Sequence, residues 1–153
     1  MLYAEQVMVV GVYDGDTMQI VRNGKKLTIH LTGIDAPELL AGKRKPGQPF
    51  SQKSKQHLSA LVLNKAVEIQ EYGTDRYGRI LGVVYLDRIN INIEMLSAGL
   101  AEIDRGEPPK GLDLEPYRKA EQSAKTAGLG VWVLRDQYLS PKDWREMYNQ
   151  DFN

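Results

Sequence analysis

Alternating hydrophobic and polar positions at the start of the chain predict extended structure. Residues 6–13 are rich in valine and end at Asp14-Gly15-Asp16, a turn sequence, and residues 17–22 resume the extended pattern. Asn23-Gly24 then suits a two-residue hairpin turn, because both central residues of such a turn need positive φ. After this turn, hydrophobic residues alternate again at Leu27, Ile29 and Leu31. We therefore expect three consecutive antiparallel strands.

Helical spacing begins in the second third of the chain. Hydrophobic residues three and four apart predict helices at 51–63 and 113–128. Asn92 is expected to cap a short helix that runs to residue 98, and Gly99 suits its left-handed end. Short strands are expected at 67–72 and 80–86. Five strands with helices after the third and fifth are compatible with a small barrel of the oligonucleotide-binding (OB) type, but the pattern alone leaves other topologies open.

The composition excludes several kinds of chemistry. The chain has no cysteine, which rules out a disulfide, a thiolate zinc site and a cysteine nucleophile. Its two histidines, His30 and His57, are too few for a multi-histidine metal site. The 20 basic and 20 acidic residues cancel, so only a local patch would attract an anionic partner. No apolar run is long enough to span a membrane, and we expect no membrane partner.

Three short segments concentrate residues suited to catalysis. They are Asp14-Gly15-Asp16-Thr17, Gly33-Ile34-Asp35-Ala36-Pro37-Glu38 and Thr74-Asp75-Arg76-Tyr77-Gly78-Arg79. In this order, and with Gly99-Leu100-Ala101 and Trp132 after them, they resemble the thermonuclease family, the staphylococcal-nuclease-like phosphodiesterases. The resemblance implies an α+β fold with a five-stranded OB-type barrel and three α-helices. It also implies one nuclease domain over residues 1–153, with a core at about 6–132 and a C-terminal extension at 133–153.

The resemblance also implies a reaction and a role for individual residues. The family hydrolyses phosphodiester bonds of DNA and RNA with the help of calcium and leaves 3′-phosphates. Asp16 and Asp35 would ligate Ca²⁺ together with the backbone carbonyl of Ala36, a position where the family often has threonine; oxygen ligands of this kind suit calcium. Glu38 would activate the attacking water as a general base. Arg79 would bind the phosphate and neutralise the charge that grows in the transition state.

Further contacts with DNA or RNA are expected outside these residues. Tyr77 resembles the phosphate-contacting tyrosine of the family, and Arg76 lies beside it. Arg105 lies where the family nuclease has tyrosines that pack the terminal nucleotide, and its guanidinium plane would stack on a base. Residues 39–66 contain no acidic residue, and we expect this basic segment to follow the nucleic-acid backbone through Lys43, Arg44 and Lys45.

One departure from the family concerns catalysis directly. The family places a second arginine five residues before Asp35, and this chain has His30 there. An imidazole cannot form two parallel hydrogen bonds to a phosphate, and near neutral pH it is charged only part of the time. A protonated His30 would still donate one bond, and the acidic site would favour that charge. We therefore expect reduced, pH-sensitive phosphodiesterase activity.

Non-catalytic interpretations stay open beside this one. The acidic motifs also suit turns, Arg79 also suits the capping of carbonyls, and basic residues usually form a solvated face. Under these interpretations, the chain is a weak or inactive module of the staphylococcal-nuclease-like (SNase-like) type that binds nucleic acid or protein, or it is an OB barrel whose acidic residues are structural. The presence of Asp16, Asp35, Glu38 and Arg79 together favours the enzyme.

Several properties stay undetermined by the sequence. They include the preference for DNA or RNA and the choice between exonuclease and endonuclease action. No basic-then-apolar leader precedes the first strand, so the expected compartment depends on the state of the chain: secreted or periplasmic for a mature form, cytoplasmic for a complete one. We expect a monomer.

Overall fold

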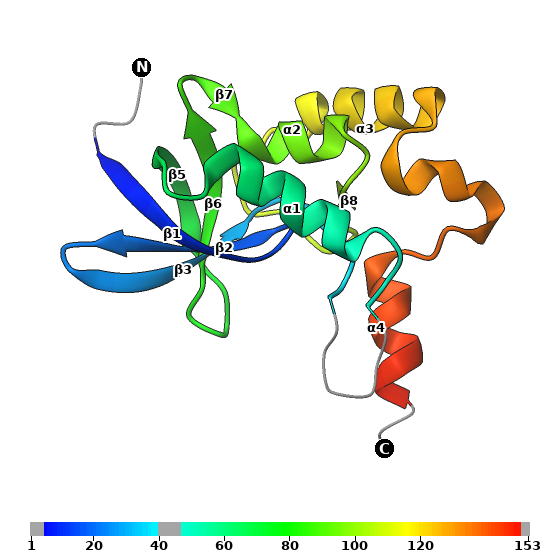
Figure 1. Ribbon diagram of the computed structural model, residues 1–153, viewed down its shortest axis with the longest axis horizontal. Coiled ribbons are helices and arrows are strands. Elements are labelled where there is room, and N and C mark those ends of the chain that lie inside the picture. The colour runs from blue at the N-terminus through cyan, green and yellow to red at the C-terminus, as the bar shows by residue number, and fades with distance from the viewer. Residues whose placement is uncertain (1–4, 40–46, 151–153) are drawn as a thin grey trace.

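A closed five-stranded barrel forms the body of the protein (Figure 1). The computed structural model of the chain describes residues 5–39 and 47–150. The strands are β1 (Gln6–Asp14), β2 (Thr17–Arg22), β3 (Lys25–Leu31), β4 (Ile34–Asp35), β5 (Ala66–Thr74), β6 (Ile80–Leu86), β7 (Ile89–Asn90) and β8 (Glu102–Ile103). The helices are α1 (Ser51–Val62), α2 (Ile91–Ser97), α3 (Glu115–Ala127), the 3₁₀ segment η1 (Gly130–Gln137) and α4 (Pro141–Gln150).

The barrel closes through one parallel pairing. Strands β3, β2, β1, β5 and β6 are antiparallel neighbours in that order, and β3 then pairs with β6 in parallel, with His30 opposite Leu81. The predicted hairpin between β2 and β3 is confirmed, since Asn23 and Gly24 have φ of 52° and 75°. The α+β fold with an OB-type barrel is therefore confirmed.

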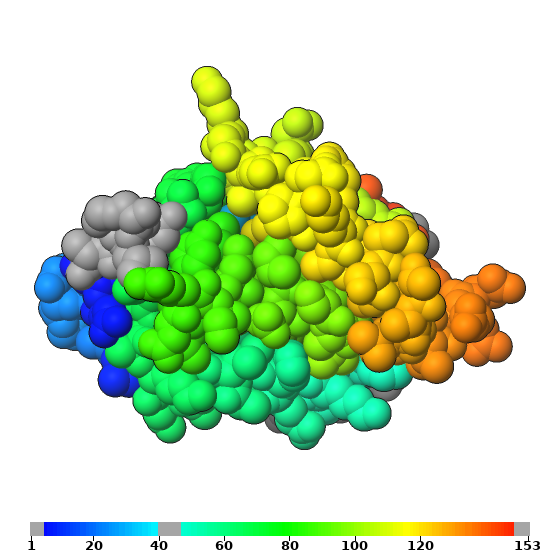
Figure 2. All heavy atoms as spheres, turned by 90° about the horizontal axis from the view of Figure 1, so that it is seen from above, coloured from blue at the N-terminus to red at the C-terminus, as the bar shows by residue number. Residues whose placement is uncertain are grey.

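Helices cover the barrel on two sides. Its interior is filled by fully buried side chains such as Val9, Ile20 and Ile29, against which α1 packs Leu58 and α2 packs Met95. In Figure 1, α1 runs from the right to the front of the barrel, α2 lies above it, and α3 lies at the upper right, beside α2. Seen from above, α2 and α3 form a continuous surface (Figure 2).

Asn92 corrects one sequence prediction. The N-cap of α2 is Asn90, whose side chain accepts a hydrogen bond from the N–H of Ile93. Asn92 lies one residue inside the helix and is fully buried. Its amide donates to the carbonyls of Thr32 and Gly82 and accepts from the N–H of Val84. Asn90 and Asn92 are two residues apart, and the sequence alone does not show which of them caps the helix. The packing of Asn92 against β6 distinguishes the two.

The tail adds structure that the sequence did not predict. Three helices were expected, and α1, α2 and α3 match them; η1 and α4 come in addition. Ser140 caps α4 by accepting a hydrogen bond from the N–H of Asp143, and Trp144 stacks on Tyr148 with ring centroids 4.3 Å apart. Among the described residues, no helix combines the length and the apolar character that crossing a membrane would need.

Candidate active site

The first two motifs meet at one end of the barrel. Asp16 lies in the β1–β2 turn and Asp35 lies in β4, and both side chains are buried, with 6% and 7% of their surface exposed. The backbone N–H of Ala36 donates to Oδ2 of Asp16 at 2.8 Å. Oδ1 of Asp16 accepts a hydrogen bond from the hydroxyl of Thr17 at 2.9 Å. Because Ala36 follows Asp35 directly, the bond to Asp16 brings the two predicted ligands together.

Gly15 explains why the first motif needs a glycine between its acids. A Cβ at this position would lie 1.8 Å from Oγ of Ser54 and 2.9 Å from Cβ of Ala36. The turn therefore packs directly on the start of α1 and on the second motif, and any larger residue would separate them. Ser54 is fixed in turn, since its hydroxyl donates to the carbonyl of Leu100 at 2.7 Å.

The electrostatics around Asp16 favour the binding of a cation. Burial raises the pKa of Asp16 well above its ordinary value, and the negative charges of Asp14 and Asp35 raise it further. A divalent ion would offset both effects. In the described part of the chain, no group of three or more histidine, cysteine, aspartate or glutamate side chains surrounds a common point. Two carboxylates and a backbone carbonyl fit calcium nevertheless, because water and substrate oxygens commonly complete its coordination.

Glu38 is held beside these residues by Gln48. The N–H of Glu38 donates to Oε1 of Gln48 at 2.9 Å, and the N–H of Gln48 donates to the carbonyl of Glu38 at 2.8 Å. Gln48 is only 4% exposed, and its amide also donates to the carbonyl of Leu139 at 2.7 Å. Burial raises the pKa of Glu38 although Arg145 lowers it. The backbone at Glu38 is therefore fixed, and its carboxylate is more basic than an exposed one.

Arg145 from α4 reaches into this cluster. Its two Nη groups donate to the two carboxylate oxygens of Asp35 at 3.0 and 2.9 Å, and Nη1 also donates to Oε1 of Glu38. The paired bonds that Arg145 donates to Asp35 raise the pKa of Arg145, so the guanidinium stays charged. Arg145 lies 110 residues after Asp35 in a tail without an assigned pattern. No sequence signal of the kind used above could have found it.

The third motif positions Arg79 at the start of β6. Asp75 accepts hydrogen bonds from the backbone N–H groups of Tyr77 and Arg79, and from Nε of Arg79 at 2.6 Å. Asp75 is the one ion-pair partner of Arg79 among the described residues, so the Nη groups are available. Tyr77 is 69% exposed, and the guanidinium groups of Arg76 and Arg79 lie 5.0 and 5.6 Å from its ring. This motif presents cations and an aromatic ring to solvent.

His30 stands between the first and third motifs. It pairs with Thr17 across β2–β3 and with Leu81 across β3–β6. Its Nδ1 is buried without a hydrogen bond and lies 3.8 Å from Oδ1 of Asp16. Burial lowers the pKa of His30, and the charge of Arg79 lowers it further. The carboxylates of Asp104, Asp14 and Asp35 raise the pKa of His30, as expected, but burial and Arg79 outweigh them.

Comparisons with known proteins place the chain in a family. A family model described as "Staphylococcal nuclease homologue" matches residues 28–134. The chain belongs to this family. It is 38% identical over 149 residues to an "Uncharacterized endonuclease" of Haemophilus influenzae, a match that covers 95% of this chain and 76% of the relative. It is 35% identical over 135 residues to a "Micrococcal nuclease" of Shigella flexneri, covering 81% and 71%.

The fungal relatives are longer than this chain. A "Probable endonuclease LCL3" of Pyricularia oryzae is 33% identical over 132 residues, which are 82% of this chain but only 51% of the relative. The family match ends at residue 134, before α4 begins. The matched range therefore contains the second and third motifs and the strands from the middle of β3 onward, and leaves β1, β2, the first motif and Arg145 outside.

The remaining predicted contacts with nucleic acid either have no contact with Asp16, Asp35 or Glu38 in this structure or lie outside the described residues. Arg105 donates from Nε to Oε2 of Glu102 at 2.8 Å, so its guanidinium is engaged in an ion pair; stacking on a base stays a prediction. Glu102 is buried, pairs with Asp35 across β4–β8, and also accepts a hydrogen bond from Tyr138. The basic residues Lys43, Arg44 and Lys45 lie outside the described residues.

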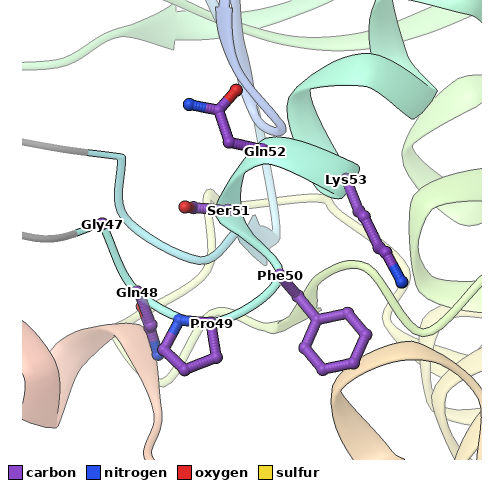
Figure 3. A pocket seen from close by; sticks show the side chains of 7 residues that line it. All are labelled: Gly47, Gln48, Pro49, Phe50, Ser51, Gln52 and Lys53. Carbon is purple, nitrogen blue, oxygen red and sulfur yellow. The ribbon is translucent and has the colours of Figure 1, made fainter.

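A pocket of about 410 Å³ opens beside the start of α1 (Figure 3). Residues 47–53 line it, and the ammonium group of Lys53 lies 5.3 Å from the ring of Phe50. Gln48 belongs to its lining, but none of the predicted site residues does. The pocket therefore adjoins the segment that holds Glu38 and is separate from the carboxylate cluster.

Proposed function

We propose that this chain is a calcium-dependent phosphodiesterase that hydrolyses DNA, RNA or both and leaves 3′-phosphates. The hydrogen bond from Ala36 to Asp16 carries the proposal, because it joins the two acidic motifs on a nuclease-family barrel. Glu38 lies within reach of the same cluster, since Arg145 contacts both Glu38 and Asp35. The names of two relatives, endonuclease and micrococcal nuclease, support a hydrolytic nuclease.

In this proposal, Asp16, Asp35 and the carbonyl of Ala36 hold the calcium ion. When bound, the ion acts as a Lewis acid on a phosphate oxygen. Glu38 takes a proton from water, whose oxygen forms the new bond to phosphorus. The bond from phosphorus to the 5′ oxygen then breaks, and that oxygen leaves with the electron pair and is protonated by solvent. Arg79 binds the phosphate through its Nη groups and neutralises the added negative charge.

Removal of calcium tests the proposal most directly. Wild-type protein is expected to release acid-soluble nucleotides from single-stranded DNA in calcium and to lose this activity in a calcium chelator, with recovery when calcium is restored. Calcium binding measured by calorimetry is the accompanying control. Binding of DNA without cleavage under every condition would contradict the proposal and would favour a binding module.

Replacement of His30 tests the expected weakness of the site. His30→Arg is expected to raise turnover about tenfold at pH 7.5, because arginine supplies a permanent cation with paired donors. Since the pKa of His30 is lowered from its ordinary value of 6.5, wild type gains a charge here only in more acidic solution, where the advantage of arginine shrinks. His57→Arg, the same change at the histidine in α1, is the control and should leave the rate unchanged. Equal turnover in wild type and His30→Arg would mean that position 30 does not limit the reaction.

A further inference from the structure

Arg145 is fixed in the site by the elements around it. The carbonyl of Leu139 accepts a hydrogen bond from Gln48, and Ser140 caps α4 and is itself buried. Just before them, the hydroxyl of Tyr138 donates to Glu102, which pairs with Asp35 across β4–β8. The segment that leads into α4 is therefore hydrogen-bonded to Gln48 and to Glu102, which flank the carboxylate cluster. An ordinary surface ion pair has no such support.

The site contains few other cations that could meet a phosphate. His30 has a buried Nδ1 without a hydrogen bond, and an imidazole cannot offer a phosphate two parallel donors. The guanidinium of Arg105 is engaged by Glu102. Among the described arginines of the three motifs and the cluster, this leaves Arg79 and Arg145, together with Arg76, whose guanidinium lies against the exposed ring of Tyr77. Phosphodiester hydrolysis adds negative charge to a phosphate that already carries one, and a single guanidinium neutralises only part of it.

Arg145 can change partners without leaving the site. Its side chain is 41% exposed, so the guanidinium is not locked in the interior. Both of its Nη groups now use the oxygens of Asp35. A divalent cation on Asp35 would compete for the same oxygens, and Arg145 would then keep Glu38 as its neighbour while one edge of its guanidinium became available. The nearest new anion would be the phosphate of the substrate.

We propose that Arg145 is a phosphate-binding residue of this nuclease site, supplied by α4 in place of the cation that position 30 lacks. The inference rests on the proposed function, because it assigns a substrate contact to the same site. In the absence of metal, the guanidinium pairs with Asp35 and Glu38 and keeps the cluster neutralised. In the reacting complex, it donates to the phosphate together with Arg79.

Turnover of Arg145 variants provides the first test. Arg145→Gln is expected to lower kcat on single-stranded DNA by about 10²- to 10³-fold, the usual effect of removing one preorganised donor. The kcat of Arg145→Lys should lie between those of wild type and Arg145→Gln, because lysine keeps the charge but not the paired donors. Arg118→Gln is the matched control, since Arg118 is an exposed arginine of α3 whose ion-pair partner is Glu115. Adding His30→Arg to Arg145→Gln is expected to restore part of the lost rate.

Two binding measurements separate this role from a structural one. Calorimetry with calcium alone should give Arg145→Gln an affinity equal to or tighter than wild type, because a competitor for Asp35 is gone. In a Glu38→Gln background, where neither protein turns over, loss of Arg145 should weaken binding of a single-stranded oligonucleotide in calcium about tenfold. The slope of log affinity against log salt should also become shallower by about 0.7.

The opposite results would overturn the inference. A turnover of Arg145→Gln equal to that of wild type would show that Arg145 does not contribute to the reaction. A turnover above that of wild type would show that Arg145 blocks the site. Weaker calcium binding in Arg145→Gln would show that the arginine only holds Asp35 in place. If wild type cleaved no nucleic acid, the proposed function would fail, and the oligonucleotide affinities with and without Arg145 would still decide whether this residue binds phosphate.

Discussion

Glu38→Gln is expected to lower kcat on single-stranded DNA by about 10²- to 10⁴-fold, the range for loss of a general base. Glutamine keeps the shape of the side chain but cannot accept a proton from water. The backbone bonds to Gln48 do not involve the side chain, so the segment should keep its position. Single-turnover kinetics together with urea unfolding would separate lost catalysis from lost stability.

Glu115→Gln is the control for this substitution. Glu115 is an exposed carboxylate of α3 that pairs with Arg118, away from the three motifs, and its replacement should leave kcat unchanged. The pH profile adds a second check. Glu38 accepts a proton only when ionised, and burial raises its pKa, so wild-type activity should fall in acid at a higher pH than an exposed glutamate would give. A Glu38→Gln rate within a few-fold of wild type would assign the base to another group.

The barrel was predictable because its strands carry their signals locally. The valine-rich first strand, the Asn-Gly hairpin and the helix-spaced positions of α1 and α3 each depend on neighbours close in sequence. The family motifs then supplied the order in which the strands close. What they could not supply was the partner of each polar side chain, because such partners are set by tertiary packing.

The parts of the site that sequence reasoning missed are contacts over long separations. Arg145 meets Asp35 across 110 residues, and Gln48 meets Leu139 across 91. Neither residue belongs to a periodic pattern, and an arginine in an amphipathic tail helix is usually a solvated residue. The position of His30, five residues before Asp35, is visible in the sequence, but the lowering of its pKa depends on burial and on the charge of Arg79. Motif spacing thus identified the acids, while the fold decided which cations accompany them.

The hydrogen-bond network around Asn92 fixes the end of β3, which leads into the second motif. Asn92 bonds the carbonyl of Thr32 at 2.9 Å, and the hydroxyl of Tyr117 donates to the same carbonyl at 2.8 Å. Thr32 also pairs with Gly82 through its own N–H, so β3 is fixed to β6 just before Asp35. Every bond in this network is buried, and each unsatisfied group left by a substitution would carry its full desolvation cost.

Asn92→Ala is therefore expected to reduce the free energy of unfolding by about 3 kcal/mol, because it leaves the buried N–H of Val84 without an acceptor and weakens the satisfaction of two carbonyls. In a chain of this size the loss corresponds to a melting temperature lower by about 6–12 °C. Tyr117→Phe is the graded comparison: Thr32 keeps its bond from Asn92, so the expected loss is about 1 kcal/mol. Urea unfolding of both variants measures the two losses. Equal effects would mean that packing of α2 and α3, rather than the amide of Asn92, accounts for the stability of this network.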